Sequence, residues 1–191
     1  MDFTIAPAAI IVLSPLLLVI AIAIKLESRG PVFFKQERLG KGTRRFTMIK
    51  FRSMFTDGEE RIKDLVALNE ATGPLFKMRR DPRITRVGRL LRRTSLDELP
   101  QLFNVLAGTM SIVGPRPPLP RELAGFDSIQ RARLRVLPGL TGLWQVSGRS
   151  DLPFEEMVRL DLEYIEKRSL VMDLRIIAMT VPSVVLGVGA Y

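Results

Sequence analysis

The stretch FTIAPAAIIVLSPLLLVIAIAI, residues 3–24, decides how this chain is organised. Only a threonine, a serine and two prolines interrupt its apolar side chains. At about 1.5 Å per residue, a helix of this length is long enough to cross a bilayer. No basic residue precedes the run, whereas Lys25 follows it, and a cleaved signal peptide has the opposite arrangement. We therefore expect residues 1–29 to form a retained membrane anchor and residues 30–191 to form a domain on the cytoplasmic face.

Pro15 lies near the middle of this run, where it removes one backbone hydrogen bond and presses against the carbonyl of Ile11. A bend at Ser14-Pro15 follows, and the Ser14 hydroxyl is one local group able to bond the freed carbonyl. Two topologies fit such a bend. One is a kinked helix that crosses the bilayer, and the other is a re-entrant helix that enters and leaves by the same face.

The rest of the chain alternates strand and helix patterns. Two aromatic and β-branched runs, at residues 32–34 and 45–51 with Gly40-Lys41-Gly42 between them, are typical of an antiparallel β-hairpin. Helical spacing of apolar residues predicts helices at 57–69, from 83 onwards, and at 99–106, 121–136, 153–168 and 170–188. The proline cluster at 115–120 and the glycine-rich segment 138–149 are predicted connectors. We expect an α+β fold, mainly helical, with a small antiparallel hairpin and amphipathic helices at the membrane interface.

Composition limits the chemistry. The 191 residues include 29 Lys and Arg against 20 Asp and Glu, a net charge of +9, and contain no His and no Cys. The positive charge predicts a polyanionic partner, and nucleic acid, an anionic membrane and a phosphorylated substrate each satisfy it. The missing Cys excludes disulfides and thiol catalysis, and the missing His removes the commonest general base. Covalent or acid–base catalysis must therefore use Asp, Glu, Lys, Ser, Thr or Tyr.

Asp97 and Glu98 are the adjacent acids best placed for such chemistry. Ser95 and Glu98 have the spacing of a capping box, which would place Asp97 in the first turn of a helix. The positive helix end and the nearby Arg92 favour the ionised carboxylate, and so a nucleophile. The same pair also fits an ordinary helix cap without a chemical role.

Arginines around this pair suit phosphate binding. Arg116 stands between prolines in Gly114-Pro115-Arg116-Pro117-Pro118, on a stiff backbone, and guanidinium groups form forked contacts with phosphate oxygens. The basic helix from residue 83 adds further cations, and Arg149 is a third candidate phosphate or nucleotide contact. Trp144 is a candidate to stack a base. The alternatives are solvated surface arginines and a Trp144 that belongs to the core.

Together these motifs resemble those of the monotopic phosphoglycosyl transferases. These bacterial sugar transferases move a sugar 1-phosphate from a nucleotide diphosphate sugar to polyprenyl phosphate. The resemblance covers nearly the whole chain and rests on Ser14-Pro15, KFRSM at 50–54, DPRIT at 81–85, SLDELPQ at 95–101, GTMSIVGPRP at 108–117 and PGLTG at 138–142. The final Gly189-Ala190-Tyr191 is similar to members that initiate exopolysaccharide, capsule or O-antigen repeats.

The resemblance implies an enzyme of the bacterial inner membrane with a re-entrant helix broken at Ser14 and Pro15. Residues 30–191 would then be the catalytic domain. The chain lacks the basic amphipathic stretch with which the family opens, and many relatives carry extra membrane helices. Whether this chain is a catalytic module of a longer protein is therefore left open, as is its oligomeric state, a homo-oligomer included.

The resemblance also implies roles for individual residues. Asp97 would be the nucleophile that forms an aspartyl-phosphosugar and releases a nucleoside monophosphate, and Glu98 would assist with a metal or with the proton. Mg²⁺, held by Asp97 and Glu98, would neutralise the diphosphate. The residues implied to bind phosphate or nucleotide are Lys50, Arg92, Arg116 and Arg149.

Family analogy favours a uridine diphosphate sugar of glucose or galactose and no nucleic acid. Two other functions stay open. One is a membrane-tethered module that binds nucleic acid or anionic lipid, which would leave the acidic pair unexplained. The other is a non-catalytic scaffold for a polysaccharide assembly complex, in which Asp97→Asn would have no effect.

Overall fold

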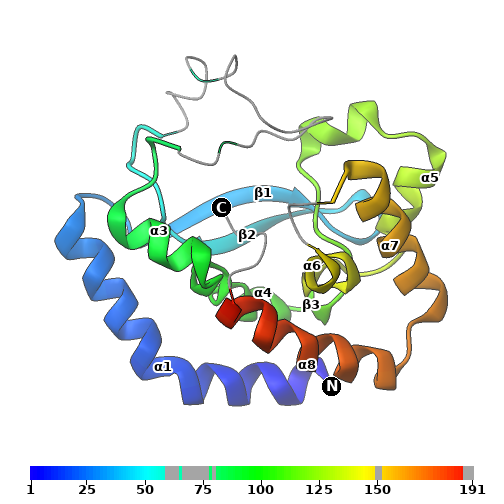
Figure 1. Cartoon of the computed structure of the whole chain (residues 1–191), viewed down its shortest axis with the longest axis horizontal. Coiled ribbons are helices and arrows are strands. Elements are labelled where there is room, and N and C mark those ends of the chain that lie inside the picture. The colour runs from blue at the N-terminus through cyan, green and yellow to red at the C-terminus, as the bar shows by residue number, and fades with distance from the viewer. Residues whose placement is uncertain (59–64, 66–77, 79–80, 149–151, 187–191) are drawn as a thin grey trace.

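The computed structural model describes residues 1–58, 65, 78, 81–148 and 152–186 of the chain. Helices dominate these residues, together with two small two-stranded sheets (Figure 1). The predicted fold class, α+β and mainly helical, is confirmed. The helix predicted at 57–69 lies almost entirely outside the described residues.

Helix α1, Asp2–Glu27, includes the whole apolar run and bends part-way along its length (Figure 1). The Ser14 hydroxyl donates a hydrogen bond of 2.8 Å to the carbonyl of Ile11, the acceptor that Pro15 leaves free. The predicted bend and its local hydrogen bond are confirmed. Within the part of the chain that the structure describes, α1 is the one helix long and apolar enough to cross a membrane.

Most of the apolar surface of α1 faces outwards, and its two ends are tied to the rest of the protein. Only Ala6, Ile20 and Ile24 are buried within the helix. At its start, the Asp2 carboxylate accepts a hydrogen bond of 3.2 Å from the backbone N–H of Ile112. At its end, the Glu27 carboxylate accepts from the N–H groups of the first turn of helix α3, Arg86–Arg93. The apolar helix is therefore docked on the domain rather than separate from it.

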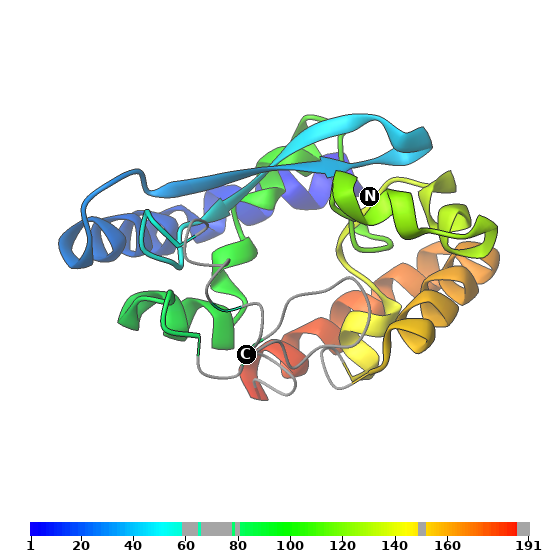
Figure 2. The ribbon, with the colours of Figure 1, turned by 90° about the horizontal axis from the view of Figure 1, so that it is seen from above.

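Strands β1, Phe33–Leu39, and β2, Arg45–Phe51, form the predicted antiparallel hairpin. The first strand continues five residues beyond its predicted end. Helix α4, Gln101–Leu106, holds β2 through Asn104, whose side-chain amide donates to the Thr47 carbonyl at 2.7 Å and accepts from the Ile49 N–H at 3.0 Å. Figure 2 shows the hairpin beside α1 and α4, with α8 on the opposite side.

The basic helix α3 begins at Arg86 rather than Arg83 because the preceding residues have other partners. Arg83 forms a buried ion pair with Asp81 at 2.6 Å, and Ile84 pairs with Met54 in an isolated β-bridge. The Thr85 side chain caps the helix by accepting from the Gly88 N–H at 2.9 Å.

Segment 138–149, predicted as a plain connector, contains a strand and a helix, so that prediction is wrong. Strand β4, Gly139–Thr141, pairs in parallel with β3, Ser111–Val113, and helix α6, Leu143–Ser147, follows it. Glycine is required at position 139, because a side chain there would collide with the backbone of Gly114. The pairing depends on this close approach between distant segments.

The helix predicted at 121–136 is also wrong, because that region divides into three short pieces. They are η4, Pro120–Gly125, α5, Ser128–Arg131, and η5, Ala132–Arg135. The Asp127 carboxylate accepts from the Gln130 N–H at 2.7 Å and so starts a new helical turn after Phe126 takes an extended conformation. The local cap at Asp127 therefore breaks the single helix that the spacing of apolar residues predicted.

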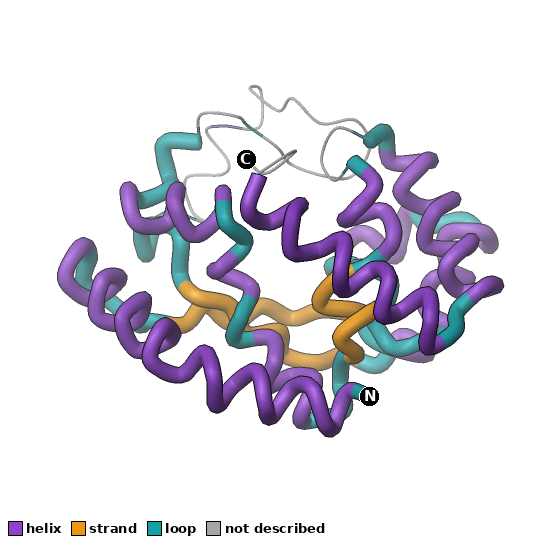
Figure 3. The backbone as a smooth tube through the Cα atoms, turned by 60° about the horizontal axis from the view of Figure 1, so that its bottom comes forward, coloured by secondary structure: helices purple, strands orange, loops and turns teal. Residues whose placement is uncertain are grey.

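Two longer helices close the chain as predicted. Helix α7 covers Phe154–Lys167 and α8 covers Leu170–Leu186, with Pro182 inside it. Figure 3 shows α1 and α8 on the same face of the molecule. Helix α8 carries exposed apolar residues at Leu170, Val171, Leu174 and Val181.

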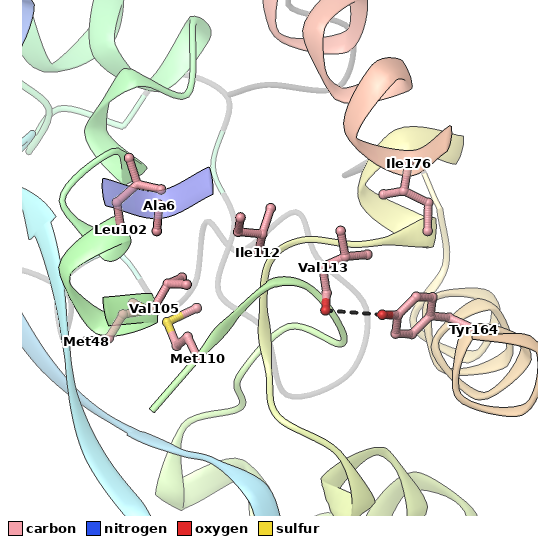
Figure 4. Close-up of a cluster of buried hydrophobic side chains, with 9 residues drawn as sticks. All are labelled: Ala6, Met48, Leu102, Val105, Met110, Ile112, Val113, Tyr164 and Ile176. Carbon is pink, nitrogen blue, oxygen red and sulfur yellow. Dashed lines mark hydrogen bonds between the residues drawn. The ribbon is translucent and has the colours of Figure 1, made fainter. Parts of the chain in front are cut away.

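One cluster of buried side chains joins elements from both ends of the chain. Figure 4 shows its buried side chains, which come from α1, β2, α4, β3, α7 and α8: Ala6, Met48, Leu102, Val105, Met110, Ile112, Val113, Tyr164 and Ile176. The Tyr164 hydroxyl donates to the Val113 carbonyl at 3.2 Å (Figure 4) and to the Asp173 carboxylate at 2.8 Å. The cluster fixes α1 and α8 relative to the strands, and a large cavity opens beside it.

Candidate active site

A cavity of about 1900 Å³ runs between the hairpin, the segment after α3, the proline-rich segment and helix α8. Five of the predicted site residues line it: Lys50, Arg92, Asp97, Glu98 and Arg116. They come from four separate parts of the chain. Arg149, the remaining predicted phosphate contact, lies outside the described residues. The fold therefore brings together the described members of the predicted site.

Asp97 lies in a 3-10 turn, Leu96–Glu98, that connects α3 to α4. The predicted capping box is wrong, because Ser95 takes a left-handed conformation with φ of 52° and its side chain caps nothing. Instead the Glu98 carboxylate turns to Lys50. Asp97 itself is only 8% exposed, although it lines the cavity. The turn thus places one acid in a buried position and directs its neighbour towards the hairpin.

Burial raises the pKa of Asp97 to about 6, and the charge of Glu98 adds to the rise, while Lys50 and Arg92 lower it. The predicted environment, one that favours the ionised form, is therefore wrong in its net direction. Loss of solvation outweighs the nearby cations because the carboxylate has lost nearly all contact with water. The group is still mostly ionised at pH 7, and it is a stronger base than an exposed carboxylate.

Lys50 connects the hairpin to the acidic pair. Its ammonium group, on β2, donates to the Glu98 carboxylate at 2.5 Å, and both side chains are less than one third exposed. Its charge also lowers the pKa of Asp97. A single cation thereby compensates two adjacent carboxylates and, in the cavity, faces any phosphate brought near them.

Arg92 approaches Asp97 from α3. Its Nε donates to the Ser53 hydroxyl at 2.9 Å, which fixes the guanidinium beside the end of β2. Burial lowers the pKa of Arg92, while the charges of Asp97 and Asp81 raise it. Because the Asp81 carboxylate is already paired with Arg83, Arg92 keeps donors for a ligand in the cavity.

Arg116 stands on another wall of the cavity, in the proline-rich segment. Its guanidinium lies 3.5 Å from the carboxylate of Glu122, which is buried and also accepts from the Leu119 N–H at 3.0 Å. Glu122 thus orients the arginine without closing over it, and the Arg116 side chain remains 31% exposed.

Trp144 and Arg38 also line the cavity. Trp144 is buried and packs with Met157 and Leu160, so the core role is confirmed for it, although one side also lines the cavity. Arg38, a buried arginine of β1, also lines the cavity, and our reading of the sequence missed it. Alternation along the observed strand places Gln36 and Arg38 on the same inward face as Phe34, but the predicted strand ended at residue 34.

Too few of the acidic side chains described in the cavity lie together to hold a magnesium ion by themselves. No group of three or more His, Cys, Asp or Glu side chains is close enough to hold a metal ion within the described ranges. Asp97 and Glu98, which both line the cavity, are the two carboxylates that would hold such an ion. Mg²⁺ typically uses one or two carboxylates together with substrate phosphates, so this donor set fits an ion that arrives with a diphosphate.

Comparison with known proteins identifies the family of this chain. The sequence model of the family described as bacterial sugar transferase matches residues 1–187. The galactosyl transferase CpsE of Streptococcus agalactiae is 49% identical over 84% of this chain and 36% of its own length. The exopolysaccharide production protein ExoY of Rhizobium meliloti is 42% identical over 100% of this chain and 86% of its own length.

A further relative, the undecaprenyl-phosphate glucose phosphotransferase of Komagataeibacter xylinus, is 44% identical over 100% of this chain. The chain spans 36% of the length of that protein, as it does for CpsE, but most of the length of ExoY. The family match covers nearly every residue, including all those that line the cavity. The chain therefore belongs to the bacterial sugar transferase family.

Proposed function

We propose that the chain transfers a sugar 1-phosphate from a nucleotide diphosphate sugar, with uridine as the expected nucleoside, to polyprenyl phosphate. It would thereby begin the synthesis of an exopolysaccharide, capsule or O-antigen at the bacterial inner membrane. The observation that carries the proposal is the buried carboxylate of Asp97, which lines a large cavity together with Lys50 and Arg92 and feels the charge of both. The names of the relatives agree, because one is an undecaprenyl-phosphate glucose phosphotransferase and another an undecaprenyl-phosphate galactose phosphotransferase.

In the proposed reaction, one oxygen of the Asp97 carboxylate attacks the phosphorus that carries the sugar. The phosphoanhydride bond breaks, its electron pair leaves with the nucleoside monophosphate, and a bond from phosphorus to Asp97 forms. An oxygen of polyprenyl phosphate then attacks the same phosphorus and releases the carboxylate. One phosphoanhydride is broken and one is made, so the reaction needs no ATP.

The cations around Asp97 make this attack feasible. A carboxylate that approaches a diphosphate meets an anion, and the two repel each other unless positive charge lies between or beside them. The charges of Lys50 and Arg92 act on the carboxylate, and Arg116 adds a further cation to the wall of the cavity. Fixed charges in a site with little water stabilise the growing charge on the phosphoryl oxygens without reorganising during the reaction.

We propose Mg²⁺ as the cofactor, held by Asp97 and Glu98 together with the diphosphate. When bound, the ion would neutralise charge on the phosphates and on the leaving group. Removal of divalent cations with EDTA should then stop nucleotide release, and added Mg²⁺ should restore it. Full activity in EDTA would contradict this assignment.

The arrangement of the membrane-facing elements supports a lipid-borne acceptor. Ala9 and Leu13 of α1 line the same cavity as Asp97, and so do Ile177 and Val181 of α8. The two helices lie on one face of the molecule (Figure 3), and both carry exposed apolar side chains. A phosphate carried on a long apolar chain can therefore approach the carboxylate from the lipid side, while a soluble nucleotide sugar enters from the water side.

We further propose that α1 is re-entrant, with the domain on the cytoplasmic face. Both ends of the helix bind this one domain, through Asp2 with Ile112 and through Glu27 with Val87. A helix that crossed the bilayer would place its ends on opposite sides of the membrane, which these paired contacts do not favour.

Because the natural chain has no cysteine, single-cysteine variants can test this topology. Thr4→Cys and Arg29→Cys place a thiol near either end of α1, at exposed positions. An impermeant maleimide applied to inside-out vesicles should label both variants, and right-side-out vesicles should show little labelling of either. Labelling of the two positions from opposite sides would show a spanning helix.

The overall proposal is tested with the purified chain in lipid nanodiscs that contain polyprenyl phosphate. A panel of nucleotide sugars is added, and released nucleoside monophosphate and the lipid product are identified. We expect one or a few uridine diphosphate sugars to give both products in equal amounts. Failure of every nucleotide sugar to release a monophosphate, with protein that is folded and embedded, would contradict the proposal.

A further inference from the structure

Arg38 is a buried cation at the edge of the cavity that none of the roles above uses. It lies near the end of β1, only 7% exposed, and its guanidinium lines the cavity that holds Asp97. Removing an arginine from water is costly unless a charged partner replaces the lost solvation. The partners that the structure provides are neutral. They are the side chain of Gln36 and the carbonyl of Pro117.

The hydrogen bonds of Arg38 leave part of its guanidinium free for a ligand. Nε and Nη2 donate to Oε1 of Gln36 at 3.1 and 2.6 Å, and Nη1 donates to the Pro117 carbonyl at 3.0 Å. A guanidinium has five N–H donors, so the bonds formed with described residues use three. One donor remains on each terminal nitrogen, and two such donors suit the forked contact that arginine makes with a phosphate.

The surroundings of Arg38 carry an excess of positive charge. Arg116 and Arg121 line the same part of the cavity wall, and Glu122 is the acid of this group. Burial, followed by the charge of Arg116, holds the pKa of Arg38 well below its usual value, although the group stays charged at neutral pH. The guanidinium groups of Arg116 and Arg121 repel that of Arg38, the carboxylate of Glu122 offsets part of this repulsion, and a bound anion would relieve more of it.

Arg38 is also connected to the reacting centre. The charge of Glu98 is near enough to act on its guanidinium, and the bond to Pro117 fixes it beside the segment that carries Arg116. Arg92 reaches Asp97 from the opposite element, α3. The acidic pair therefore has cations on two walls of the cavity.

We infer that Arg38 and Arg116 together form a phosphate-binding subsite of the cavity. The inference rests on the proposed function, which supplies two phosphate-bearing substrates. The ligand is the phosphate group itself, carried by either the nucleotide diphosphate sugar or polyprenyl phosphate. In this subsite Gln36 orients Arg38 through a neutral amide, so the full positive charge of the guanidinium remains available to the ligand.

The charge of Arg38 can be tested separately from its structural bonds. Arg38→Gln removes the charge and the fork. Gln36→Glu keeps an oxygen for Nε and Nη2 to donate to, and adds a carboxylate that neutralises Arg38 in place. If Arg38 only supported the fold, Gln36→Glu would be neutral or stabilising, because a carboxylate is the stronger acceptor. The matched control is Arg45→Gln, which removes a cation from the same hairpin at a position 68% exposed.

The experiment measures KM for each substrate in turn, with the other saturating, and thermal unfolding of each variant. Loss of a charged hydrogen bond predicts a KM for one substrate raised about 10- to 100-fold in Arg38→Gln, and a smaller rise in Gln36→Glu with no loss of thermal stability. Arg45→Gln should match the wild type. A rise confined to the nucleotide sugar assigns the subsite to the diphosphate, and a rise confined to the lipid assigns it to polyprenyl phosphate.

Unchanged KM values for both substrates in folded Arg38→Gln would overturn the inference. If Arg38→Gln does not fold, Gln36→Glu decides in the same way. If the wild type turns over no nucleotide sugar, the proposed function has failed, and the subsite is judged by binding of inorganic phosphate in calorimetry. Weaker binding in Gln36→Glu than in Arg45→Gln would then support the subsite, and equal binding would overturn it.

Discussion

Asp97 and Asp161 are two buried aspartates of this protein that the same physical effect shifts in the same direction. Burial raises the pKa of each to about 6. Asp161, on α7, forms a buried ion pair with Arg133 of η5 at 2.6 Å and is 0% exposed. Asp97 lines the cavity, makes no ion pair within 4 Å among the described residues, and lies near cations that serve other partners as well.

The difference teaches that a shifted pKa alone does not identify a reactive group. The carboxylate of Asp161 is enclosed by the contact between α7 and η5, so its charge serves to compensate Arg133 and no substrate can reach it. The carboxylate of Asp97 is kept short of partners and faces an open volume. We interpret Asp161 as structural and Asp97 as reactive, and the following variants test that contrast.

The largest expected effect is the loss of transfer in Asp97→Asn. The amide lacks the nucleophilic oxygen, so sugar phosphate transfer should fall by about 10⁴-fold or more. Nucleotide release is measured with a labelled nucleotide sugar in membranes that contain equal amounts of each protein. Transfer in Asp97→Asn within tenfold of the wild type would remove the distinction between the two aspartates.

The next largest effect is on stability in Asp161→Asn. This change leaves the buried charge of Arg133 uncompensated, which typically costs about 3–5 kcal/mol of the free energy of unfolding. Denaturant unfolding measures the change, and transfer per folded molecule should stay within a few-fold of the wild type.

The matched control for that variant replaces the whole pair, Arg133→Met with Asp161→Leu. It should recover most of the lost stability, because no buried charge is then left alone. If Asp161→Asn instead lost transfer and kept its stability, the structural assignment would be wrong.

A third effect has the opposite sign and concerns the stability of Asp97→Asn. The pKa of Asp97 is higher in the folded protein than its ordinary value of 3.8, so ionisation weakens the native state as the pH rises from about 4 to 6. The amide removes this penalty, and the free energy of unfolding should rise by roughly 2–3 kcal/mol at pH 7.5. At pH 4 and below, the gain should vanish. Equal stability of variant and wild type at pH 7.5 would argue against a solvent-deprived carboxylate.

The pH dependence of transfer gives a fourth, smaller effect. The proposed nucleophile is the ionised carboxylate, so kcat/KM should be half-maximal near pH 6 and fall about tenfold for each further unit of acidity. An acid limb centred near pH 4 would indicate an exposed carboxylate. The profile is measured on membranes that keep their fold over the whole range.

The smallest effect is a displacement of that limb in Lys50→Gln. The charge of Lys50 lowers the pKa of Asp97, so its removal should move the acid limb to higher pH. Lys41→Gln, at the exposed tip of the same hairpin, is the matched control and should leave the limb in place. If the acid limb does not move in Lys50→Gln, the charge of Lys50 does not lower the pKa of Asp97.

The parts of the fold that depend on local chemistry could be predicted from the sequence. Pro15 determines the bend in α1 through its missing N–H, and the hydroxyl of the neighbouring Ser14 donates to the carbonyl that is left free. The hairpin and helices α4 and α7 follow from the spacing of their apolar residues. The helix predicted at 121–136 failed because Asp127 offers a competing local cap.

The remaining features depend on contacts between distant residues. Strand β4 exists because Gly139 meets Gly114 across the molecule, and a pattern within segment 138–149 does not contain that information. For the site, the motifs identified the acids and most of the arginines. The motifs do not show that Asp97 is buried, so the direction of its pKa shift was predicted wrongly. Arg38 was missed because the predicted first strand ended at residue 34, and only the observed length of β1 places Arg38 on the inward face.

The most direct test of the account asks whether Asp97 becomes covalently modified. Wild-type protein is incubated with its nucleotide sugar in the absence of polyprenyl phosphate, quenched in acid and analysed by intact and peptide mass spectrometry. We predict one equivalent of released nucleoside monophosphate, a mass increase of one sugar phosphate located on the peptide that contains Asp97, and no increase in Asp97→Asn. An adduct on another residue, or full product formation on later addition of lipid with no adduct at any time, would contradict the account.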